Sequence, residues 1–304
     1  MLKQIESNKQ LDFFNKTNSR FLLESQTFKH QSKPFLKWAG GKRQLINQYK
    51  NLQILPPNNF NYNSNYFEPF LGGGAIFFHL NHQNSFLSDL NEELVITYNT
   101  IKNNVLELIN SLKCHENSLE YFKKIRSLKI SEMNNLEIAS RFIYLNKTCF
   151  NGMYRVNKSG QFNTPFGNYE NPMICDIENL LSVSKSLKHT SIKHSHFREI
   201  KKFIKKGDFI YFDPPYDPIS KTSQFTSYTK FNFSEQDQIE LRDFAYQLSK
   251  SGCYVMLSNS DTNFINSIYS GLPNFKIHKV FASRSINSIA DKRGKINELV
   301  ITNY

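Results

Sequence analysis

The stretch Phe209-Ile210-Tyr211-Phe212-Asp213-Pro214-Pro215-Tyr216 decides the fold class of this chain. Its first four residues are all apolar or aromatic, as in a buried β-strand, and a carboxylate follows directly. Two prolines then stiffen the turn and remove two backbone donors. A strand that ends in a polar turn is typical of α/β sheets, which bind their ligands at the carboxyl ends of strands.

A second strand and turn lie upstream. The short apolar run Tyr66-Phe67 leads through Glu68-Pro69 into Phe70-Leu71-Gly72-Gly73-Gly74, the pattern of a strand, a tight glycine turn and a helix start. The next strand is predicted at Ser85-Phe86-Leu87-Ser88-Asp89, and a carboxylate at its end is suited to accept hydrogen bonds from ribose hydroxyls. Taken alone, these residues fit a glycine turn and a solvated aspartate equally well.

Strands and helices alternate along the rest of the chain. Residues 91–147 are expected to be helical, because apolar side chains between Leu94 and Ile109 recur at helical spacing. Ser234 is a predicted helix cap, and strands are predicted at 254–257 and 299–302. This alternation predicts an α/β fold with a mostly parallel sheet.

Residues 149–172 have a different composition, rich in Asn, Gly, Phe, Tyr and Pro. Residues 155–162 are expected to form a β-hairpin that turns near 157–160. Basic and aromatic side chains alternate here, which suits base stacking and phosphate contact, although a solvated hairpin explains them equally well. These side chains are Lys147, Phe150, Tyr154, Arg155 and Lys158. A second basic run, 185–206, is expected to be a solvated helix face.

The charge balance favours a polyanionic partner. The 304 residues carry 38 Lys and Arg against 26 Asp and Glu, a net charge of +12, and each neutralised phosphate releases counterions. A solvated basic surface is the alternative. Hydrophobic residues make up 39% of the chain, with 27 Phe, which is enough for a buried core and argues against wholesale disorder.

The four cysteines are far apart, and no C-x-x-C pair suggests zinc. They fit a reducing cytoplasm better than a disulfide scaffold. No apolar run is long enough to span a bilayer, and the first twenty residues lack a signal-peptide segment. We therefore expect a soluble, cytoplasmic protein that uses neither a metal nor a membrane.

The stretch Phe35-Leu36-Lys37-Trp38-Ala39-Gly40-Gly41-Lys42 superficially resembles a phosphate-binding loop. That loop requires Gly at position 36 and Ser or Thr at 43, where this chain has Leu36 and Arg43, so nucleotide hydrolysis is disfavoured. Judged by spacing alone, Trp38 is an ordinary core aromatic.

The Asp-Pro-Pro-Tyr turn suits chemistry on an aromatic amine. Such an amine is a poor nucleophile because its lone pair is delocalised into the ring. The Asp213 carboxylate and the Pro214 carbonyl could accept its two N–H bonds and localise that lone pair, while Tyr216 offers a flat face for stacking. A proline-rich turn with a helix-capping aspartate is less favoured, given the strand before it and the glycine motif upstream.

In this order, the segments resemble the Dam-like DNA adenine N6-methyltransferases, the D12 class with the alpha-group motif order. The resemblance runs from about Phe35 to Tyr304. It rests on FLKWAGGK, FEPFLGGGAIF, SDLNEEL, YLNKTCFNGMYRVNKSGQFNTPFGNY, IYFDPPY and the tail RSIN…KRGKINELVITNY. It implies a Rossmann-like S-adenosylmethionine-dependent methyltransferase sheet with an inserted helical and β-hairpin target-recognition domain. Residues 33–95 and 186–304 would form the catalytic domain, 96–185 the insertion, and 1–32 an N-terminal extension without an assigned role.

The resemblance also implies a set of site residues. The methyl donor S-adenosylmethionine would be contacted by Trp38, Lys42, Phe70, Gly72, Gly74, Asp89 and Asp213. Catalysis on a flipped-out adenine would rest on Asp213, Pro214 and Tyr216. Double-stranded DNA, expected at GATC, would be read or probed by Lys37, Phe150, Met153, Arg155 and Pro165; Phe150 replaces the tyrosine of some relatives. A cognate restriction endonuclease would be a further partner.

Two kinds of alternative remain open. The same fold could act on cytosine N4, on RNA or on a protein amide, but the acidic first residue of D-P-P-Y and the FNGMYRVN insert favour adenine in DNA. The chain could instead be a catalytically inactive DNA-binding relative. Intact Asp213, Tyr216 and Asp89 argue against that reading.

Overall fold

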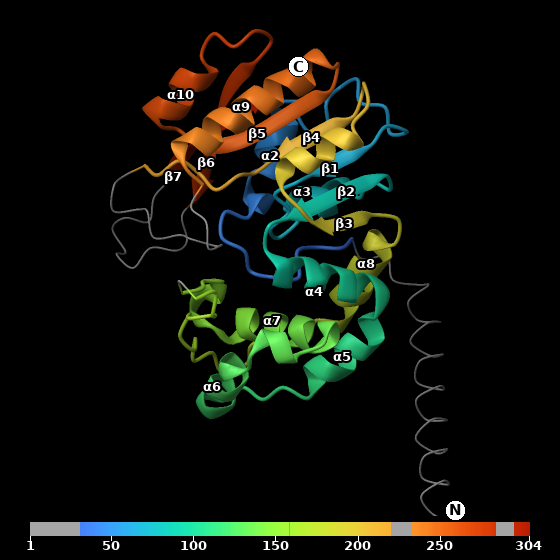
Figure 1. The fold of residues 1–304 in the computed structure, drawn as a ribbon, viewed down its shortest axis with the longest axis vertical. Coiled ribbons are helices and arrows are strands. Elements are labelled where there is room, and N and C mark those ends of the chain that lie inside the picture. The colour runs from blue at the N-terminus through green and yellow to red at the C-terminus, as the bar shows by residue number, and fades with distance from the viewer. Residues whose placement is uncertain (1–30, 158, 220–232, 284–294) are drawn as a thin grey trace, which may run out of the picture.

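The fold is built around one seven-stranded sheet, beside which lies a group of helices (Figure 1). The computed structural model describes residues 31–157, 159–219, 233–283 and 295–304. The strand order is β3-β2-β1-β4-β5-β7-β6; β1 to β5 pair in parallel, and β7 runs antiparallel to both of its neighbours. The strands are β1 (Tyr66–Glu68), β2 (Ser85–Asp89), β3 (Ser191–His194), β4 (Phe209–Phe212), β5 (Tyr254–Ser260), β6 (Lys276–Ser283) and β7 (Lys295–Thr302). The predicted Rossmann-like α/β fold is confirmed.

Both faces of the sheet are buried, which explains why its strands read as continuous apolar runs. In β4, Phe209 and Tyr211 join one core cluster, while Ile210 and Phe212 join the other. The helices of the sheet are α2 (Ile46–Asn51), α3 (Ala75–Leu80), α9 (Glu235–Lys250) and α10 (Asn263–Tyr269), with the 3-10 turns η1 (Lys42–Gln44) and η4 (Phe197–Lys202). Ser234 caps α9 in a capping box with Asp237, as predicted.

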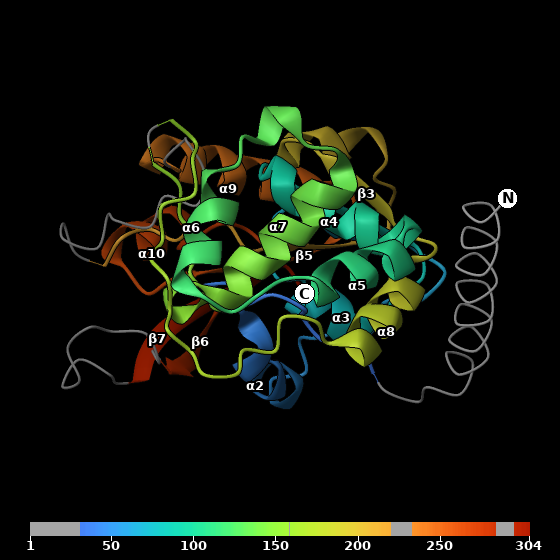
Figure 2. The same cartoon turned by 90° about the horizontal axis from the view of Figure 1, so that it is seen from below.

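The segment between β2 and β3 is mostly helical and lies on one side of the sheet, so that it stands in front of the sheet in the view from below (Figures 1 and 2). It contains α4 (Glu92–Asn103), α5 (Val105–Lys113), α6 (Leu119–Ser127), η2 (Ile130–Glu132), α7 (Asn135–Thr148), η3 (Phe150–Gly152) and α8 (Ile177–Leu187). Helix α4 packs against α7 and against β2 and β3, so it belongs to both parts. The expected domain boundaries at 95/96 and 185/186 lie inside α4 and α8.

Two of the sequence expectations need correction. Residues 91–147 are mostly helical, as predicted, but the apolar run from Leu94 to Ile109 is divided between α4 and α5, because the backbone leaves the helical region at Asn104, with φ −137° and ψ 41°. The asparagine side chain competes for backbone hydrogen bonds and therefore favours helix ends. The helical spacing of the apolar residues nevertheless continues across this break. The basic run 185–206 is not a helix face either: it comprises the end of α8, the edge strand β3 and η4.

The expected hairpin is present, but it is held by single bridges rather than by regular strands. Val156 pairs with Phe162, and the Asn157 N–H donates to the Gln161 carbonyl at 2.8 Å. A second bridge joins Cys149 to Phe166. Lys158 lies outside the described residues, as does most of the predicted tail motif at 284–294.

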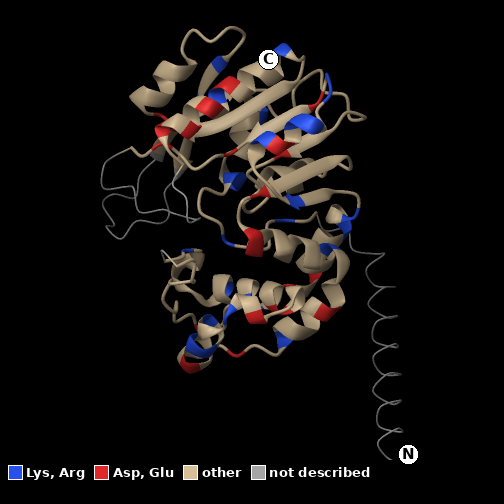
Figure 3. Ribbon diagram, viewed as in Figure 1, with Lys and Arg blue, Asp and Glu red and all other residues tan. Residues whose placement is uncertain are grey.

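Charged residues are spread over both the sheet and the helical segment (Figure 3). No helix among the described residues is long and apolar enough to cross a membrane. Within the same residues, no group of three or more His, Cys, Asp or Glu side chains is arranged to hold a metal ion.

Candidate active site

The strand order reverses between β1 and β4. Strands β2 and β3 continue on one side of this pair and β5 on the other, and Tyr66 and Phe67 of β1 pair with Phe209 and Ile210 of β4. Ligands of open α/β sheets bind in the crevice outside the carboxyl ends of the strands at such a switch point. Glu68 ends β1 and Asp213 directly follows β4, so both carboxylates lie at this place.

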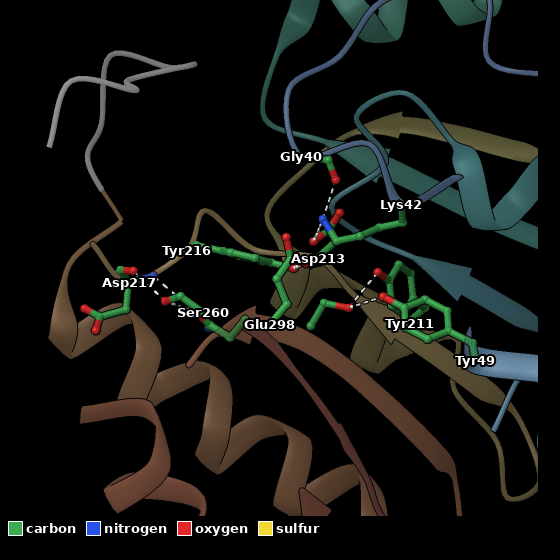
Figure 4. Close-up of polar contacts among 11 residues, drawn as sticks. Gly40, Lys42, Tyr49, Tyr211, Asp213, Tyr216, Asp217, Ser260 and Glu298 are labelled. Carbon is green, nitrogen blue, oxygen red and sulfur yellow. Dashed lines mark hydrogen bonds and ion pairs between the residues drawn. The ribbon is translucent and has the colours of Figure 1, made fainter. Parts of the chain in front are cut away.

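Lys42 and Asp213 form an ion pair at the switch point (Figure 4). The Lys42 Nζ lies 2.9 Å from Asp213 Oδ1 and also donates to the Gly40 carbonyl. The same ammonium lies 4.7 Å from the centroid of the Tyr216 ring, within range of a cation–π contact. The lysine is buried, whereas the Asp213 side chain keeps 22% of its surface exposed and is open to a ligand.

Burial shifts the acidity of both carboxylates. It raises the pKa of Asp213 from 3.8 to about 6, although the nearby Lys42 ammonium lowers this pKa. Burial also raises the pKa of Glu68 from 4.5 to about 8, while a hydrogen bond of 2.7 Å from the Tyr66 hydroxyl to Oε2 acts in the opposite direction. Asp213 is therefore largely ionised at neutral pH, whereas Glu68 is largely protonated.

A chain of amide side chains holds the turn after β4 in place. The Pro215 carbonyl accepts from Gln238 Nε2 at 2.9 Å, and Gln238 Oε1 accepts from Asn259 Nδ2 at 2.9 Å. Asn259 Oδ1 in turn accepts from the Asp217 N–H at 3.1 Å. Pro214 is buried, and no described residue donates a hydrogen bond to its carbonyl.

Tyr216 is anchored by a residue of β7, which lies two strands away from β4 in the sheet. Its hydroxyl donates to Glu298 Oε2 at 2.9 Å, and Glu298 lies on the antiparallel strand β7. Beneath it, the hydroxyls of Tyr211 and Tyr49 meet Ser258 Oγ at 2.8 and 3.4 Å (Figure 4). The bond to Glu298 and the contact with the Lys42 ammonium hold the Tyr216 ring in place.

The glycine turn and Asp89 are bonded to one another. Asp89 Oδ2 accepts from the Gly72 N–H and Oδ1 from the Asn91 N–H, both at 2.9 Å. Burial raises the pKa of Asp89, and these backbone hydrogen bonds oppose the shift. The predicted ribose-binding carboxylate therefore also fixes the turn, and it keeps lone pairs for a ligand.

Trp38 explains the glycine at position 72. A Cβ there would lie 2.8 Å from Trp38 Cδ1 and Nε1, and Gly72 has a positive φ of 47°. At Gly74, with φ 67°, a Cβ would lie 2.7 Å from the Tyr98 hydroxyl. Phe70 lies apart from this packing and stacks on Phe197, with ring centroids 5.5 Å apart, in the core cluster of the other sheet face.

The residues expected to read DNA lie in one neighbourhood. Buried Asn146 accepts from the Lys37 N–H at 2.9 Å and donates to the carbonyls of Lys37 and Gly152 at 2.8 and 3.0 Å. The Phe150 N–H donates to the Pro165 carbonyl at 2.8 Å, and the Phe150 side chain is 53% exposed.

Arg155 stands on the hairpin next to this group. It is exposed, and its Nε donates to Asn163 Oδ1 at 2.8 Å. Met153 lies between Phe150 and Arg155 in the chain, and its carbonyl accepts from Thr164 Oγ1 at 2.6 Å. The structure thus brings Lys37, Phe150, Met153, Arg155 and Pro165 together beside the sheet.

Sequence reasoning assigned no role to four residues in or next to this site. They are Glu68, Glu298, Asn146 and Glu93, whose carboxylate accepts a hydrogen bond from the Tyr154 hydroxyl. Glu68 could have been noticed as an acidic residue that directly follows an apolar strand, in the way Asp213 was. Glu298, Asn146 and Glu93 carry no comparable local signal, because their partners are 82, 109 and 61 residues away in the chain.

Comparison with known proteins agrees with this geometry. The family of D12 class N6 adenine-specific DNA methyltransferases matches residues 38–286. The chain belongs to this family. It is 45% identical over 280 residues to the Type II methyltransferase M1.LlaDCHI of Lactococcus lactis subsp. cremoris, a match that covers 90% of this chain and 95% of the relative. It is 43% identical over 291 residues to the Type II methyltransferase M.MjaIII of Methanocaldococcus jannaschii, covering 90% and 99%.

A third relative has a different kind of name. The DNA adenine methylase of Serratia marcescens is 31% identical over 275 residues, covering 89% of this chain and 98% of that protein. Membership of the D12 class confirms the expected Dam-like resemblance and identifies this chain as an adenine-specific DNA methyltransferase.

Proposed function

We propose that this D12 class methyltransferase transfers a methyl group from S-adenosylmethionine to the N6 amine of a flipped-out adenine in GATC. The observation that carries the proposal is the position of Asp213, which is partly exposed at the switch point, paired with Lys42 and next to the Pro214 carbonyl, to which no described residue donates. A carboxylate and a carbonyl side by side form a double acceptor, which is what an exocyclic amine requires.

The chain's contribution to the reaction is positioning and electrostatics. The ionised Asp213 and the Pro214 carbonyl accept the two N–H bonds of the amine, which localises the nitrogen lone pair. The Tyr216 ring, fixed by Glu298, stacks on the flipped base. The new N–C bond forms as the methyl–sulfur bond breaks, leaving a neutral thioether, and the surplus proton on N6 is released to Asp213 or to water.

The residues around the glycine turn fit a nucleoside with a charged methionine end. Asp89 offers a carboxylate at the carboxyl end of β2, and the backbone from Gly72 to Gly74 carries no side chain toward Trp38 or Tyr98. When bound, S-adenosylmethionine supplies an electrophilic methyl group on a sulfonium centre. We assign its binding to Asp89, Trp38, Lys42, Phe70 and the turn.

Residues 96–185 serve, in this proposal, as the target-recognition insertion, and residues 33–95 and 186–304 as the catalytic part. A hairpin can enter the major groove, where each base pair shows a distinct pattern of donors and acceptors. Arg155 is exposed on the hairpin and suited to a bidentate contact with guanine, while Lys37, Phe150, Met153 and Pro165 line its base. Duplex DNA as substrate implies an intracellular, DNA-associated enzyme.

Two of the relatives are named Type II methyltransferases, which supports a role beside a restriction endonuclease that recognises the same site. The Serratia relative, a DNA adenine methylase, supports the alternative that the enzyme acts without such a partner. Protection of host DNA from an endonuclease that cuts unmethylated GATC would be expected in either case.

The experiment is methyl transfer from labelled S-adenosylmethionine to a duplex with a single GATC, followed by digestion and identification of the labelled nucleoside. We expect N6-methyladenine from the wild type and none from Asp213→Ala, which should still bind DNA. Label on cytosine N4, or equal transfer to RNA, would reject the proposed substrate. Near-normal turnover by Asp213→Ala would reject the proposed mechanism.

A further inference from the structure

Tyr154 lies where the recognition segment meets the cofactor side of the enzyme. Its ring is stacked on Trp38, with centroids 5.8 Å apart and an interplanar angle of 23°. Its hydroxyl donates to Glu93 Oε1 at 2.7 Å, in the first turn of α4. Tyr154 is 6% exposed, so both its ring and its hydroxyl are committed to these buried contacts.

The acceptor of this hydrogen bond is itself held in place. Glu93 Oε2 forms an ion pair with Arg141 NH1 at 3.0 Å, and the Arg141 side chain is only 4% exposed. Arg141 also donates to the carbonyls of Ile125 and Arg126, so α4, α6 and α7 converge on this group. The position of Tyr154 is therefore fixed by the helical segment and not by the hairpin alone.

Tyr154 also packs against Phe142 and Phe162, with ring centroids 5.0 and 5.8 Å away, but its partner Trp38 belongs to the proposed cofactor site. Trp38 lies against Gly72, and the Gly72 N–H is bonded to Asp89. Asp89 is four residues before Glu93, and its Oδ1 accepts from the N–H of Asn91, the cap residue of α4, whose own side chain accepts from the Leu94 N–H. A ligand that shifts or rigidifies Trp38 and the glycine turn thus acts on the surface against which the Tyr154 ring is stacked.

On its other side, Tyr154 is followed by Arg155, the proposed guanine reader. A second connection runs parallel to this one, because Asn146 bonds the backbone of Lys37, next to Trp38, to the carbonyl of Gly152. The cofactor loop and the recognition segment are therefore joined by the stack of Trp38 on Tyr154 and by the Asn146 hydrogen bonds, and Trp38 also lies 6.3 Å from the ring of Phe142 in α7.

We propose that Tyr154 is a positioning residue that couples occupancy of the cofactor site to recognition of the DNA sequence. The inference rests on the proposed function. A rigid, contiguous contact shared by two sites lets binding at one favour the bound arrangement at the other, and such coupling is reciprocal. Tyr154 itself touches neither reacting atom; it sets where Arg155 stands relative to the flipped base.

The test measures the affinity for a GATC duplex with and without saturating S-adenosylhomocysteine, by fluorescence anisotropy, in the wild type and two variants. In the wild type, we expect the product to tighten DNA binding by about fivefold or more. Tyr154→Leu, which removes the ring, should bring this ratio close to one. Tyr154→Phe keeps the stacking on Trp38 and loses the Glu93 bond, so its ratio should lie between the two.

The matched control is Tyr144→Phe. Tyr144 is another buried tyrosine of the helical segment, and its hydroxyl donates to the Glu116 carbonyl at 2.9 Å without contact to the cofactor loop. This variant should keep the wild-type ratio. A wild-type ratio of one, an unchanged ratio in Tyr154→Leu, or an equal loss in Tyr144→Phe would each overturn the inference.

Analysis of methylated nucleosides on the same samples distinguishes a failure of the Tyr154 inference from a failure of the proposed function. If the wild type forms N6-methyladenine but Tyr154→Leu keeps full coupling, only the inference fails. If the wild type forms none, the proposed function fails with it. Should Tyr154→Leu not fold, the comparison of Tyr154→Phe with Tyr144→Phe decides the outcome.

Discussion

The ammonium of Lys42 lies 2.9 Å from Oδ1 of Asp213, at the carboxyl end of β4. This pair joins the loop before η1 to the Asp-Pro-Pro-Tyr turn, two segments that are 171 positions apart in the sequence. Burial raises the pKa of Asp213, and the neighbouring Lys42 ammonium lowers it by favouring the ionised form. Lys42 therefore determines whether the proposed acceptor of the adenine amine is charged at neutral pH.

Replacing Lys42 should shift the pH dependence of turnover. The pKa of Asp213 is about 6. Only the ionised carboxylate can both pair with Lys42 and accept hydrogen bonds from the adenine amine. Loss of the ammonium in Lys42→Met raises this pKa, so the acidic limb of kcat against pH should move upward by roughly one unit. The measurement is kcat from pH 5 to 9 at saturating cofactor. Lys42→Arg keeps the charge and should retain the wild-type limb; an unmoved limb in Lys42→Met would contradict the assignment.

Glu68 should make folding stability depend on pH. Its pKa is about 8 in the folded protein, against an ordinary value of 4.5, because burial disfavours the carboxylate. The contribution of Glu68 to the free energy of unfolding is therefore fully present below about pH 4.5 and is lost as the pH rises through about 8. Glu68→Gln mimics the protonated carboxyl and should melt higher than wild type at pH 9, by about 5 °C, with little difference at pH 5. A constant difference at both pH values would show that Glu68 is not buried as a neutral acid.

Asp89 should govern cofactor affinity. Asp89→Ala removes a charged acceptor and the bond to the Gly72 N–H, and we expect weaker S-adenosylmethionine binding by about 1–3 kcal/mol. Asp89→Asn keeps one acceptor for the turn and should lose less. Calorimetry with the purified proteins measures both dissociation constants, and an unchanged constant in Asp89→Ala would remove Asp89 from the site.

Arg155 should determine which DNA sequence the enzyme methylates, and not merely how tightly it binds DNA. Loss of a bidentate contact to guanine costs about 1–3 kcal/mol and relaxes the choice of base at one position. We therefore expect Arg155→Ala to narrow the difference in kcat/KM between GATC and one singly substituted site. Lys129→Ala, which precedes η2 and forms an exposed ion pair with Glu132, is the control and should leave this ratio unchanged. An equal loss on every site would make Arg155 a phosphate contact.

Local patterns in the sequence were sufficient to predict the central strands. The strands at Ser85–Asp89 and Phe209–Phe212 begin and end as expected, because both are apolar runs bounded by a carboxylate. The helix break at Asn104 was missed because the apolar spacing continues across it. The hairpin was predicted from its turn residues, but its lack of regular pairing depends on packing against distant helices.

The site was only partly predictable. Motifs placed Asp213, Gly72 and Asp89 at strand ends, and the topology then brought them together. The roles of Glu298 and Tyr154 depend on contacts between segments that no local period links. Trp38 was an ordinary core aromatic by spacing alone; its position over Gly72 became visible only in the structure.

The most direct test of the central claim is sequencing of modified bases in DNA from a host that lacks adenine methylation and expresses this chain. We predict N6-methyladenine at essentially every GATC in cells with the wild type and at none in cells with Asp213→Ala. Modification at a different sequence would contradict the proposed target. Modified cytosine, or unmodified DNA despite expression of the folded protein, would contradict the account as a whole.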